Sequence, residues 1–447
     1  MARRSKTRSL VVWANGIRVG HWQLSDNGKD VLAYNAQWVA SAQGRPLSLS
    51  LPFTPGDAPL RGEAVHHYFD NLLPDNEAIR RRLQTRFRTL SADAFDLLAA
   101  IGRDCVGAIQ LLPEGMVPDD IFTIQTKILT DAEVANLLRA CATAHPALGQ
   151  HDGLDEYFRI SIAGAQEKTA LLRHQGRWCR PLGATPTSHI FKLPLGLVGN
   201  RQADMRTSVE NEWLCARIFQ RFGLPVAACE IAYFEDQKAL IVERFDRRLA
   251  EQGYWLRLPQ EDFCQATGTP PGAKYQSDGG PGLVDIARIL QQSDARDQDL
   301  KTLLKAQLLF WLMAATDGHA KNFSIFLLPG GRYQLTPLYD VLSAWPVVGR
   351  GPNQLDANRL RLAMAVKGKN THYRLKDIQR KHFNHTARLC GWGVDMEDLI
   401  GEVLESLPTV WDTAGDGLPT GFPEDVFSTI RAGMLEAANR LARMPKS

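Results

Sequence analysis

The residues best suited to chemistry in this chain lie in the segment 316–322, Thr-Asp-Gly-His-Ala-Lys-Asn. Apolar runs flank it at 308–315 and at 323–328. Asp317 and Asn322 are therefore held between two segments that belong in a core, with four residues separating them. This is the Asp-x4-Asn spacing of a protein-kinase catalytic loop, in which the Asp accepts the proton of the attacking hydroxyl and the Asn holds magnesium. The alternative is a polar turn in which Asp317 caps a helix.

A second acidic residue follows in the order that a kinase requires. The segment 323–328 is typical of a short buried strand, 329–332 of a turn, and 333–335 of a returning strand. Asp340 comes next, where a kinase places the Asp that ligates the magnesium bridging the ATP phosphates. The order of buried helix, polar loop, hairpin and second Asp favours phosphoryl transfer with ATP and Mg²⁺, and Asn322 and Asp340 are the expected metal ligands.

The residues around these carboxylates complete the expected nucleotide site. That part of the site consists of His319, Ala320, Lys321, Asn322, Tyr339 and Asp340. His319 suggests a metal-binding or nucleophilic role, but no second His lies nearby, so we interpret it as a loop residue.

A loop of small residues precedes this region. The segment 158–172 has the pattern of strand, small-residue loop and strand. Because the loop side chains lack bulk, main-chain N–H groups can approach a phosphate closely. The expected phosphate-binding residues are Ala163, Gly164, Ala165, Gln166, Glu167 and Lys168. The loop is neither Gly-x-Gly-x-x-Gly nor a Walker loop, and a turn without function is the alternative.

Lys192 ends the next predicted strand, which is where a kinase places its phosphate-contacting lysine. Taken alone, it fits an edge-strand lysine facing water equally well. On the helix predicted at about 208–222, Glu212 falls in the apolar arc, whereas Glu210 and Arg217 share a polar arc. A Glu on an inward face is costly unless it is paired. We therefore predict an ion pair between Lys192 and Glu212.

The strand predicted at 240–242 ends at the residues that we assign to the hinge. In a kinase the backbone of this hinge reads the adenine edge. The assigned residues are Glu243, Arg244 and Phe245. A strand end that binds nothing is the alternative. Further along, we expect a flexible loop at 274–282 and a helix near 297–315 that delivers Asp317.

The composition is that of an enzyme-sized chain. It has 447 residues, 44% hydrophobic and 23% charged, and a net charge of +3. Any nucleic-acid binding must therefore come from a local patch. No apolar run approaches the roughly 20 residues that span a membrane, and we expect no signal peptide and no membrane partner. The seven scattered cysteines, without Cys-x-x-Cys, indicate reduced thiols and a cytoplasmic location.

We expect four parts along the chain. They are a β-rich plus helical N-terminal domain at 1–115, a linker with a helical segment at 116–150, a lobe with the ATP-binding loop and hinge at 151–250, and a helical lobe with the catalytic loop at 251–447. In the first part, turn dipeptides separate short strands, and helices are predicted at about 63–88 and 91–101. The pairs His66-His67 and Arg103-Asp104 are interpreted as structural. After Asp340 the chain is expected to be largely helical.

The segment 366–388 is rich in basic residues and contains a single acid, Asp377. A solvated charged face is the default interpretation, and a surface that contacts DNA phosphates is the alternative. The candidate DNA contacts are Lys376, Arg380 and Lys381.

With these motifs in view, the chain resembles the HipA family of bacterial toxin kinases. The resemblance runs nearly the full length. It rests on Ser161–Lys168, Lys192, Glu243–Phe245, Asp317–Asn322 and Tyr339-Asp340, together with Asp70–Pro74, Ile101–Asp104 and Leu258–Asp262. It implies an α+β, eukaryotic-like Ser/Thr protein kinase fold with a mixed N-lobe and a mostly helical C-lobe, preceded by a small β-rich domain.

The resemblance also implies partners and regulation. It implies phosphorylation of a glutamyl-tRNA synthetase, which stalls translation and promotes dormancy and persistence. It implies a small HipB-like helix-turn-helix antitoxin, with which the toxin represses its operon on operator DNA, and autophosphorylation at Ser161. The family's DNA-contacting region falls near Lys376–Lys381, where this sequence differs.

Two other functions fit parts of the pattern. A small-molecule kinase would share Asp317, Asn322 and Asp340. A non-catalytic repressor subunit is the second, but decayed kinases usually lack one member of the set that this chain retains.

Overall fold

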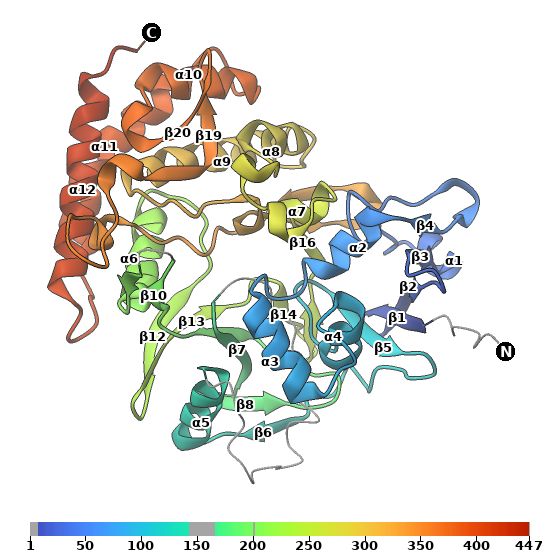
Figure 1. Ribbon diagram of the computed structural model, residues 1–447. Helices are drawn as coiled ribbons and strands as arrows, with labels where there is room; N and C mark the ends of the chain where they lie inside the picture. Colours follow the sequence, from blue (N-terminus) through green and yellow to red (C-terminus); the bar gives the residue numbers. More distant parts are fainter. Residues whose placement is uncertain (1–7, 143–165, 200–201, 447) are drawn as a thin grey trace.

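A computed structural model describes residues 8–142, 166–199 and 202–446 (Figure 1). It consists of an N-terminal domain at 8–113, a small lobe at 126–243 and a large lobe at 260–446. Figure 1 shows the blue N-terminal domain beside both the green small lobe and the yellow part of the large lobe. In the described part of the chain, no helix is both long enough and apolar enough to cross a bilayer.

The N-terminal domain is built on an antiparallel sheet in the order β4-β3-β2-β1-β5. Its strands are β1 Arg8–Ala14, β2 Ile17–Leu24, β3 Asp30–Tyr34, β4 Leu60–Arg61 and β5 Ile109–Pro113. As predicted, Asn15-Gly16 turns β1 into β2, and both residues have positive φ (46° and 78°), as a tight hairpin requires. The inner face packs on helices, with Trp22 stacked on Phe69 at 4.0 Å between ring centroids.

The helices of this domain correct one prediction. The helix expected at 63–88 is two helices, α2 Glu63–Asp70 and α3 Glu77–Phe87. The short helix α1 Ala36–Val39 precedes them, and α4 Ala94–Ile101 follows them. Leu72 and Leu73 turn into the core, and Pro74 cannot continue the helix. The Asn76 side chain then caps α3 by accepting a hydrogen bond from the Ala78 N–H (2.8 Å). The break frees segment 71–76 to reach another part of the molecule.

The small lobe contains a six-stranded sheet in the order β12-β13-β9-β7-β8-β6. The strands are β6 Thr126–Ile128, β7 Lys168–His174, β8 Arg177–Pro181, β9 His189–Lys192, β12 Cys229–Phe234 and β13 Gln237–Glu243. The segment expected as a linker supplies β6 and the helix α5 Asp131–Ala142. Val134 and Leu138 pack there against Phe191 and Ile241. The small lobe therefore begins before residue 151, because the apolar face of α5 covers its sheet.

Helix α6, Ser208–Arg221, connects the small lobe to the large lobe, as expected for the helix that carries Glu212. The short strands β10 Gly196–Val198 and β11 Ala203–Met205 precede it. Leu214, Ile218 and Phe219 are fully buried in the core that also contains the large-lobe helices. Glu210, which shares the polar arc of the helical wheel, is also buried and pairs with Lys238 at 2.5 Å.

The large lobe has the predicted order around Asp317. Helix α9, Arg296–Leu312, leads to the loop 316–322, and the strands β17 Ser324–Leu327 and β18 Tyr333–Leu335 form the hairpin before Asp340. The remaining elements are β14 Arg247–Leu249, β15 Trp255–Arg257, β16 Gln260–Asp262, α7 Phe263–Ala266, α8 Leu283–Leu290, β19 Arg361–Lys367, β20 Thr371–Arg374, α10 Arg380–Leu389, α11 Glu397–Ala414 and α12 Glu424–Arg443. The chain after Asp340 is thus less helical than expected, because β19 and β20 form a hairpin before α10.

A buried ion network joins the N-terminal domain to the segment after the hinge. The Asp104 carboxylate accepts from Arg247 Nη2 (2.9 Å) and Arg257 Nε (3.1 Å), and from the Thr187 hydroxyl (2.7 Å). Arg244 contacts it at 3.4 Å and pairs with Asp246 at 2.7 Å. Burial favours a neutral Asp104, but the three arginines outweigh it and hold its pKa well below its ordinary value. Asp104 is structural, as predicted, because its ion pairs join the N-terminal domain to residues 244–257.

Replacing this carboxylate is expected to destabilise the protein. Asp104→Asn leaves buried guanidinium charge uncompensated, so we expect the free energy of unfolding to fall by about 3–5 kcal/mol, measured by urea denaturation. Because the folded pKa is depressed, this contribution is full above the pKa of the unfolded Asp and is lost as pH falls toward the folded pKa. The exposed Glu405→Gln on α11 is the matched control, with an expected change within about 0.5 kcal/mol. Equal stability of both variants and the parent would contradict this role of Asp104.

Candidate active site

The loop 316–322, which the sequence predicts to be catalytic, begins after α9 leaves the core. The chain turns out of the helix at Ala314, whose φ is 48°, and the Ala315 N–H bonds back to the Phe310 carbonyl (2.8 Å). Asp317 then presents its carboxylate to solvent, with 59% of the side chain exposed. The Asn322 amide N–H donates to the Asp317 carbonyl (2.8 Å), which ties the two ends of the loop together. An exposed carboxylate on a fixed loop has the setting required of a base that meets an incoming hydroxyl.

Lys192 brings three elements together. Its ammonium donates to Glu212 on α6 (2.5 Å) and to Asp340 of the large lobe (2.8 Å). The pair predicted from the sequence is therefore confirmed. Burial disfavours the charge on Lys192, but Asp340 and Glu212 outweigh it and raise its pKa. Burial raises the pKa of Glu212 to about 7 against the attraction of Lys192.

The backbone of Asp340 adopts a conformation that is rare for a non-glycine residue. Its φ of 63° lies in the left-handed region, which costs about 1–3 kcal/mol for a non-glycine residue and persists where the surroundings enforce it. Burial favours the neutral form, but Lys192 and Lys168 outweigh it and hold the pKa of this carboxyl low. Asp340 is therefore ionised at neutral pH.

A second lysine lies beside Lys192. Lys168 on β7 is the direct cross-strand partner of Lys192 on β9. Burial lowers the pKa of Lys168 to about 8, with Lys192 acting in the same direction and Asp340 opposing. Within residues 8–142, 166–199 and 202–446, Lys168 forms no ion pair. Two adjacent ammonium groups that face one carboxylate make a site suited to a polyanion such as a triphosphate.

The expected magnesium ligands fit a metal that is shared with a nucleotide. Because the Asn322 nitrogen is used by the Asp317 carbonyl, its amide oxygen remains for a cation, and Lys192 occupies only one oxygen of Asp340. In the part of the chain that is described, no group of three or more His, Cys, Asp or Glu side chains gathers as a metal cage. Magnesium is commonly held by one or two protein oxygens plus substrate phosphates, so this small donor set is appropriate.

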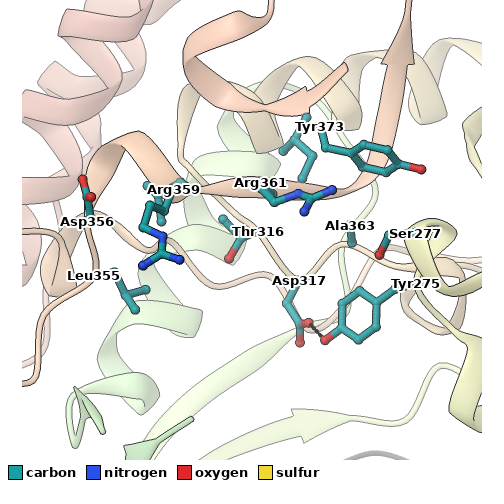
Figure 2. A pocket seen from close by; sticks show the side chains of 12 residues that line it. Tyr275, Ser277, Thr316, Asp317, Leu355, Asp356, Arg359, Arg361, Ala363 and Tyr373 are labelled. Carbon is teal, nitrogen blue, oxygen red and sulfur yellow. Dashed lines mark hydrogen bonds between the residues drawn. The ribbon is translucent and has the colours of Figure 1, made fainter. Parts of the chain in front are cut away.

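Tyr275 reaches Asp317 from the segment between α7 and α8. Its hydroxyl donates a hydrogen bond to the Asp317 carboxylate, drawn as a dashed line in Figure 2. Its ring meets the His319 ring edge to face, with 5.1 Å between centroids. Burial lowers the pKa of His319, so this ring is neutral and packs inside the loop. The segment 274–282, expected as a flexible loop, thus contains a short 3₁₀ turn at 276–278 and supplies a direct contact to the Asp317 carboxylate.

Comparison with known proteins now identifies the fold. The HipA-like C-terminal domain family matches residues 160–411, and the HipA N-terminal domain family matches residues 10–112. The chain belongs to the HipA family.

Two relatives support this assignment. A putative kinase Y4mE of Sinorhizobium fredii is 35% identical over 340 residues, which cover 75% of this chain and 77% of that protein. The serine/threonine-protein kinase toxin HipA of Shewanella oneidensis is 28% identical over 357 residues, 76% of each chain. The chain is therefore homologous to a Ser/Thr protein kinase.

A solved structure confirms the fold. The Shewanella oneidensis complex of HipA, HipB and operator DNA matches with a TM-score of 0.75 and 24% identity, over 97% of each chain. The predicted α+β kinase fold with a β-rich N-terminal region is therefore confirmed.

The loop expected to bind phosphate, residues 163–168, is described only in part. Ser161, Ala163, Gly164 and Ala165 lie outside the described residues. The Gln166 side chain donates to the Leu193 carbonyl, and Glu167 pairs with Arg82 of α3. The loop therefore ends against both the small lobe and the N-terminal domain.

Two of the three N–H groups assigned to the hinge are already used within the protein. The N–H groups of Glu243 and Arg244 already bond to the carbonyls of Ala228 (2.8 Å) and Ser188 (2.9 Å), and the Arg244 side chain belongs to the Asp104 network. The expectation that Arg244 serves a nucleotide is therefore wrong for its N–H and its side chain. Phe245 lies against the ring of Tyr339, with 5.6 Å between centroids, and the Tyr339 hydroxyl donates to the Lys321 carbonyl (2.8 Å).

The Lys321 side chain corrects a second expectation. It was expected to contact the nucleotide, but its ammonium is 4% exposed and points to the N-terminal domain. It donates to the Asn71 side-chain oxygen (2.9 Å) and to Asp75 (3.0 Å). The other Asp75 oxygen accepts from Lys274 (2.9 Å), the neighbour of Tyr275. One carboxylate thus holds both sides of the Asp317 site.

The candidate DNA contacts divide into two groups. Lys376 and Lys381 are exposed. Arg380 is buried and forms an ion pair with Glu397 at 2.5 Å, and its Nε lies 3.0 Å from both carboxylate oxygens. The expectation that Arg380 contacts DNA is therefore wrong, because the first turn of α10 faces its side chain inward to meet α11.

Sequence reasoning missed the residues that act across domains. No sequence motif links Asp75, Lys274 or Tyr275 to Asp317. The segment Asp70–Pro74 contributed to the resemblance, but nothing in it indicated a contact 250 residues away along the chain, as between Asn71 and Lys321. Pro74 and the break between α2 and α3 were the available signal, since a broken helix frees its polar residues for other partners.

Asp75→Asn is expected to weaken catalysis without weakening nucleotide binding. Loss of the carboxylate removes the ion pairs of Lys321 and Lys274, and Lys321 keeps only its weaker contacts such as that with Asn71. The loop with Asp317 is therefore held less firmly. We expect kcat to fall by about 10- to 100-fold, with the Kd for ATP, measured by calorimetry, unchanged within about twofold.

Three controls separate positioning from general damage. Asp75→Glu should restore part of kcat, and Asp93→Asn, an exposed acid of the same domain, should match the parent. The double variant Asp75→Asn with Lys321→Met should have a kcat no lower than that of the less active single variant, because both residues act in one network. Additive losses would show that Asp75 and Lys321 act independently.

Proposed function

We propose that this protein is an ATP- and Mg²⁺-dependent Ser/Thr protein kinase that acts as the toxin of a toxin–antitoxin pair. The observation that carries the proposal is the joint contact of Lys192 with Glu212 and Asp340, across the site from Asp317 and Asn322. The homology to the Shewanella oneidensis toxin kinase supports it.

The residues support a simple division of labour. Lys168 and Lys192 bind the ATP phosphates, the Phe245 N–H contacts the adenine, and Asn322 and Asp340 hold magnesium. Magnesium, when bound, neutralises charge on the phosphates. Asp317 accepts the proton of a Ser or Thr hydroxyl as its oxygen attacks the γ-phosphorus, and ADP leaves. Most of the rate enhancement comes from positioning and charge stabilisation.

The family resemblance supports the finer biology. We propose that the target is a translation component, a glutamyl-tRNA synthetase, and that its phosphorylation causes growth arrest and persistence in the cytoplasm. We propose a HipB-like antitoxin that joins the protein on operator DNA and represses the operon. Support comes from the related Shewanella structure, whose components are HipA, HipB and operator DNA.

We also propose that Ser161 is an autophosphorylation site that silences the kinase. Phosphorylation adds a charge of about −1.5 to −2 close to the expected phosphate loop, where it repels a triphosphate. Ala163, Gly164 and Ala165 offer little side-chain bulk to hold that loop in place.

The central test is to find what the protein phosphorylates. Purified protein is added to a bacterial lysate with radiolabelled ATP and magnesium. A labelled protein band, identified by mass spectrometry, supports a protein kinase. Label confined to small molecules, or no transfer at all, would overturn the proposal.

Substitutions of Asp317 and Asp340 should impair different steps, the transfer reaction and nucleotide binding respectively. Asp317→Asn keeps ATP binding but loses transfer by about 10²–10⁴-fold, the usual contribution of a positioned base. Asp340→Asn weakens Mg²⁺-ATP binding itself, because a metal-ligating charge is removed. Calorimetry with ATP and a kinase assay on the same preparations separate the two. Full activity of Asp317→Asn would contradict the assignment of Asp317 as the general base.

The exposed lysines near α10 should affect DNA binding only. We expect Lys376→Ala with Lys381→Ala to lower the affinity of the toxin–antitoxin complex for operator DNA. The salt dependence should flatten by about one unit per lost phosphate contact. Arg61→Ala, an exposed cation on β4, is the matched control. Kinase assays and binding titrations at several salt concentrations measure both effects, and an unchanged slope would leave this patch a plain solvated face.

A further inference from the structure

A cavity of about 430 Å³ opens next to the Asp317 carboxylate, and neither lysine of the expected phosphate site, Lys168 or Lys192, lines it. Thr316 and Asp317 line one part of it, and Leu355, Asp356, Arg359–Ala363 and Tyr373 line another (Figure 2). Tyr275 stands at the edge with its hydroxyl donating to Asp317. That contact is the one an acceptor hydroxyl makes with a catalytic base, so it marks where the substrate hydroxyl lies. The cavity therefore surrounds the position of the acceptor residue.

Two arginines give this cavity its chemistry. Arg359, in the short 3₁₀ turn Ala357–Arg359, and Arg361, the first residue of β19, both extend into the space shared with Asp317 (Figure 2). The guanidinium of Arg361 lies over the ring of Tyr373, 5.1 Å from its centroid, which restricts its direction. Both residues are exposed, and neither forms an ion pair with any residue that the structure describes. Elsewhere in this protein, the buried arginines at 244, 247 and 257 all have carboxylate partners.

The lining also contains two carboxylates, and each accepts a hydrogen bond from a group other than these arginines. Asp317 is the catalytic carboxylate and already accepts from Tyr275. Asp356 caps the 3₁₀ turn by accepting from the Asn358 N–H (2.9 Å). Guanidinium groups bind carboxylates and phosphates through paired, charge-assisted hydrogen bonds. Two guanidinium groups beside the acceptor position are thus suited to an anionic group on the substrate itself.

We infer that this cavity binds the residues flanking the phosphorylated Ser or Thr, and that Arg359 and Arg361 select an acidic side chain close to the acceptor. The inference rests on the proposed function and adds the substrate class to it. The preferred target is a protein segment in which Asp or Glu lies within a few residues of the acceptor hydroxyl. When that segment binds, its hydroxyl takes the place of the Tyr275 hydroxyl on Asp317.

The test is a series of short serine peptides in which each neighbouring position carries Ala, Asp or Lys in turn. At one or more positions we expect Asp to raise kcat/KM over Ala by about tenfold, the usual value of a charge-assisted hydrogen bond, and Lys to lower it. Arg359→Gln and Arg361→Gln should each reduce the Asp preference through KM. Arg361→Glu should reverse it, so that the Lys peptide becomes the better substrate. Arg443→Gln, an exposed cation on α12, should keep the parent preference.

Each outcome decides something. Equal kcat/KM for Ala, Asp and Lys peptides overturns the inference while the kinase proposal stands. Equal losses on all peptides in the arginine variants, with weaker ATP binding, would show that the arginines serve the nucleotide and also overturn it. If only lysate proteins are labelled, the residues around the mapped phosphosite decide, and a site without Asp or Glu nearby counts against it. Failure to label any peptide or protein is instead a failure of the proposed function.

Discussion

The active site depends on one buried ammonium group, that of Lys192. It is the point at which strand β9, helix α6 and the residue after the β17–β18 hairpin meet. A buried cation without partners would lose its charge, so the fold must supply carboxylates from two directions. This requirement ties β9 of the small lobe to Asp340 of the large lobe. A triphosphate offers the same kind of partner, so the arrangement that stabilises the protein alone is also suited to a nucleotide.

The N-terminal domain uses the same physical device at two more points. Asp104 is held among Arg244, Arg247 and Arg257 after the hinge, and Asp75 is held between Lys321 and Lys274 beside the catalytic loop. Both contacts place a carboxylate of this domain against cations of the kinase part. Buried ion pairs contribute less to stability than their number suggests, but they enforce a particular geometry and penalise any other. The domain is therefore built into the site and cannot be regarded as an appendage to it.

The sequence was informative where the chemistry is local. The spacing of Asp317 and Asn322, the hairpin and Asp340 all lie within one short stretch, where periodicity and turn residues fix the structure. The ion pair of Lys192 with Glu212 was also accessible, because a Glu in the apolar arc of a helix demands a cation. Predictions failed where a side chain has two possible partners. Arg380 was one of several basic residues in its segment, and only the position of α11 turns it toward Glu397. Lys321 was assigned to the nucleotide because of its neighbours in the chain, and the break between α2 and α3 gives it Asn71 and Asp75 instead.

The sequence by itself thus predicted the family and the kinase fold, which the comparisons confirm, and it supplied the candidate reacting residues, because all three depend on residue type and spacing. Tertiary structure alone decided which polar groups meet. It brings Asp75 to Lys321, Asp104 to its arginines and Tyr275 to Asp317, and it places Arg359 and Arg361 at an open cavity. The reason is that electrostatic and hydrogen-bond partners are set by distances of a few ångströms in space, and residues that close can be separated by more than two hundred positions along the chain, as Asn71 and Lys321 are.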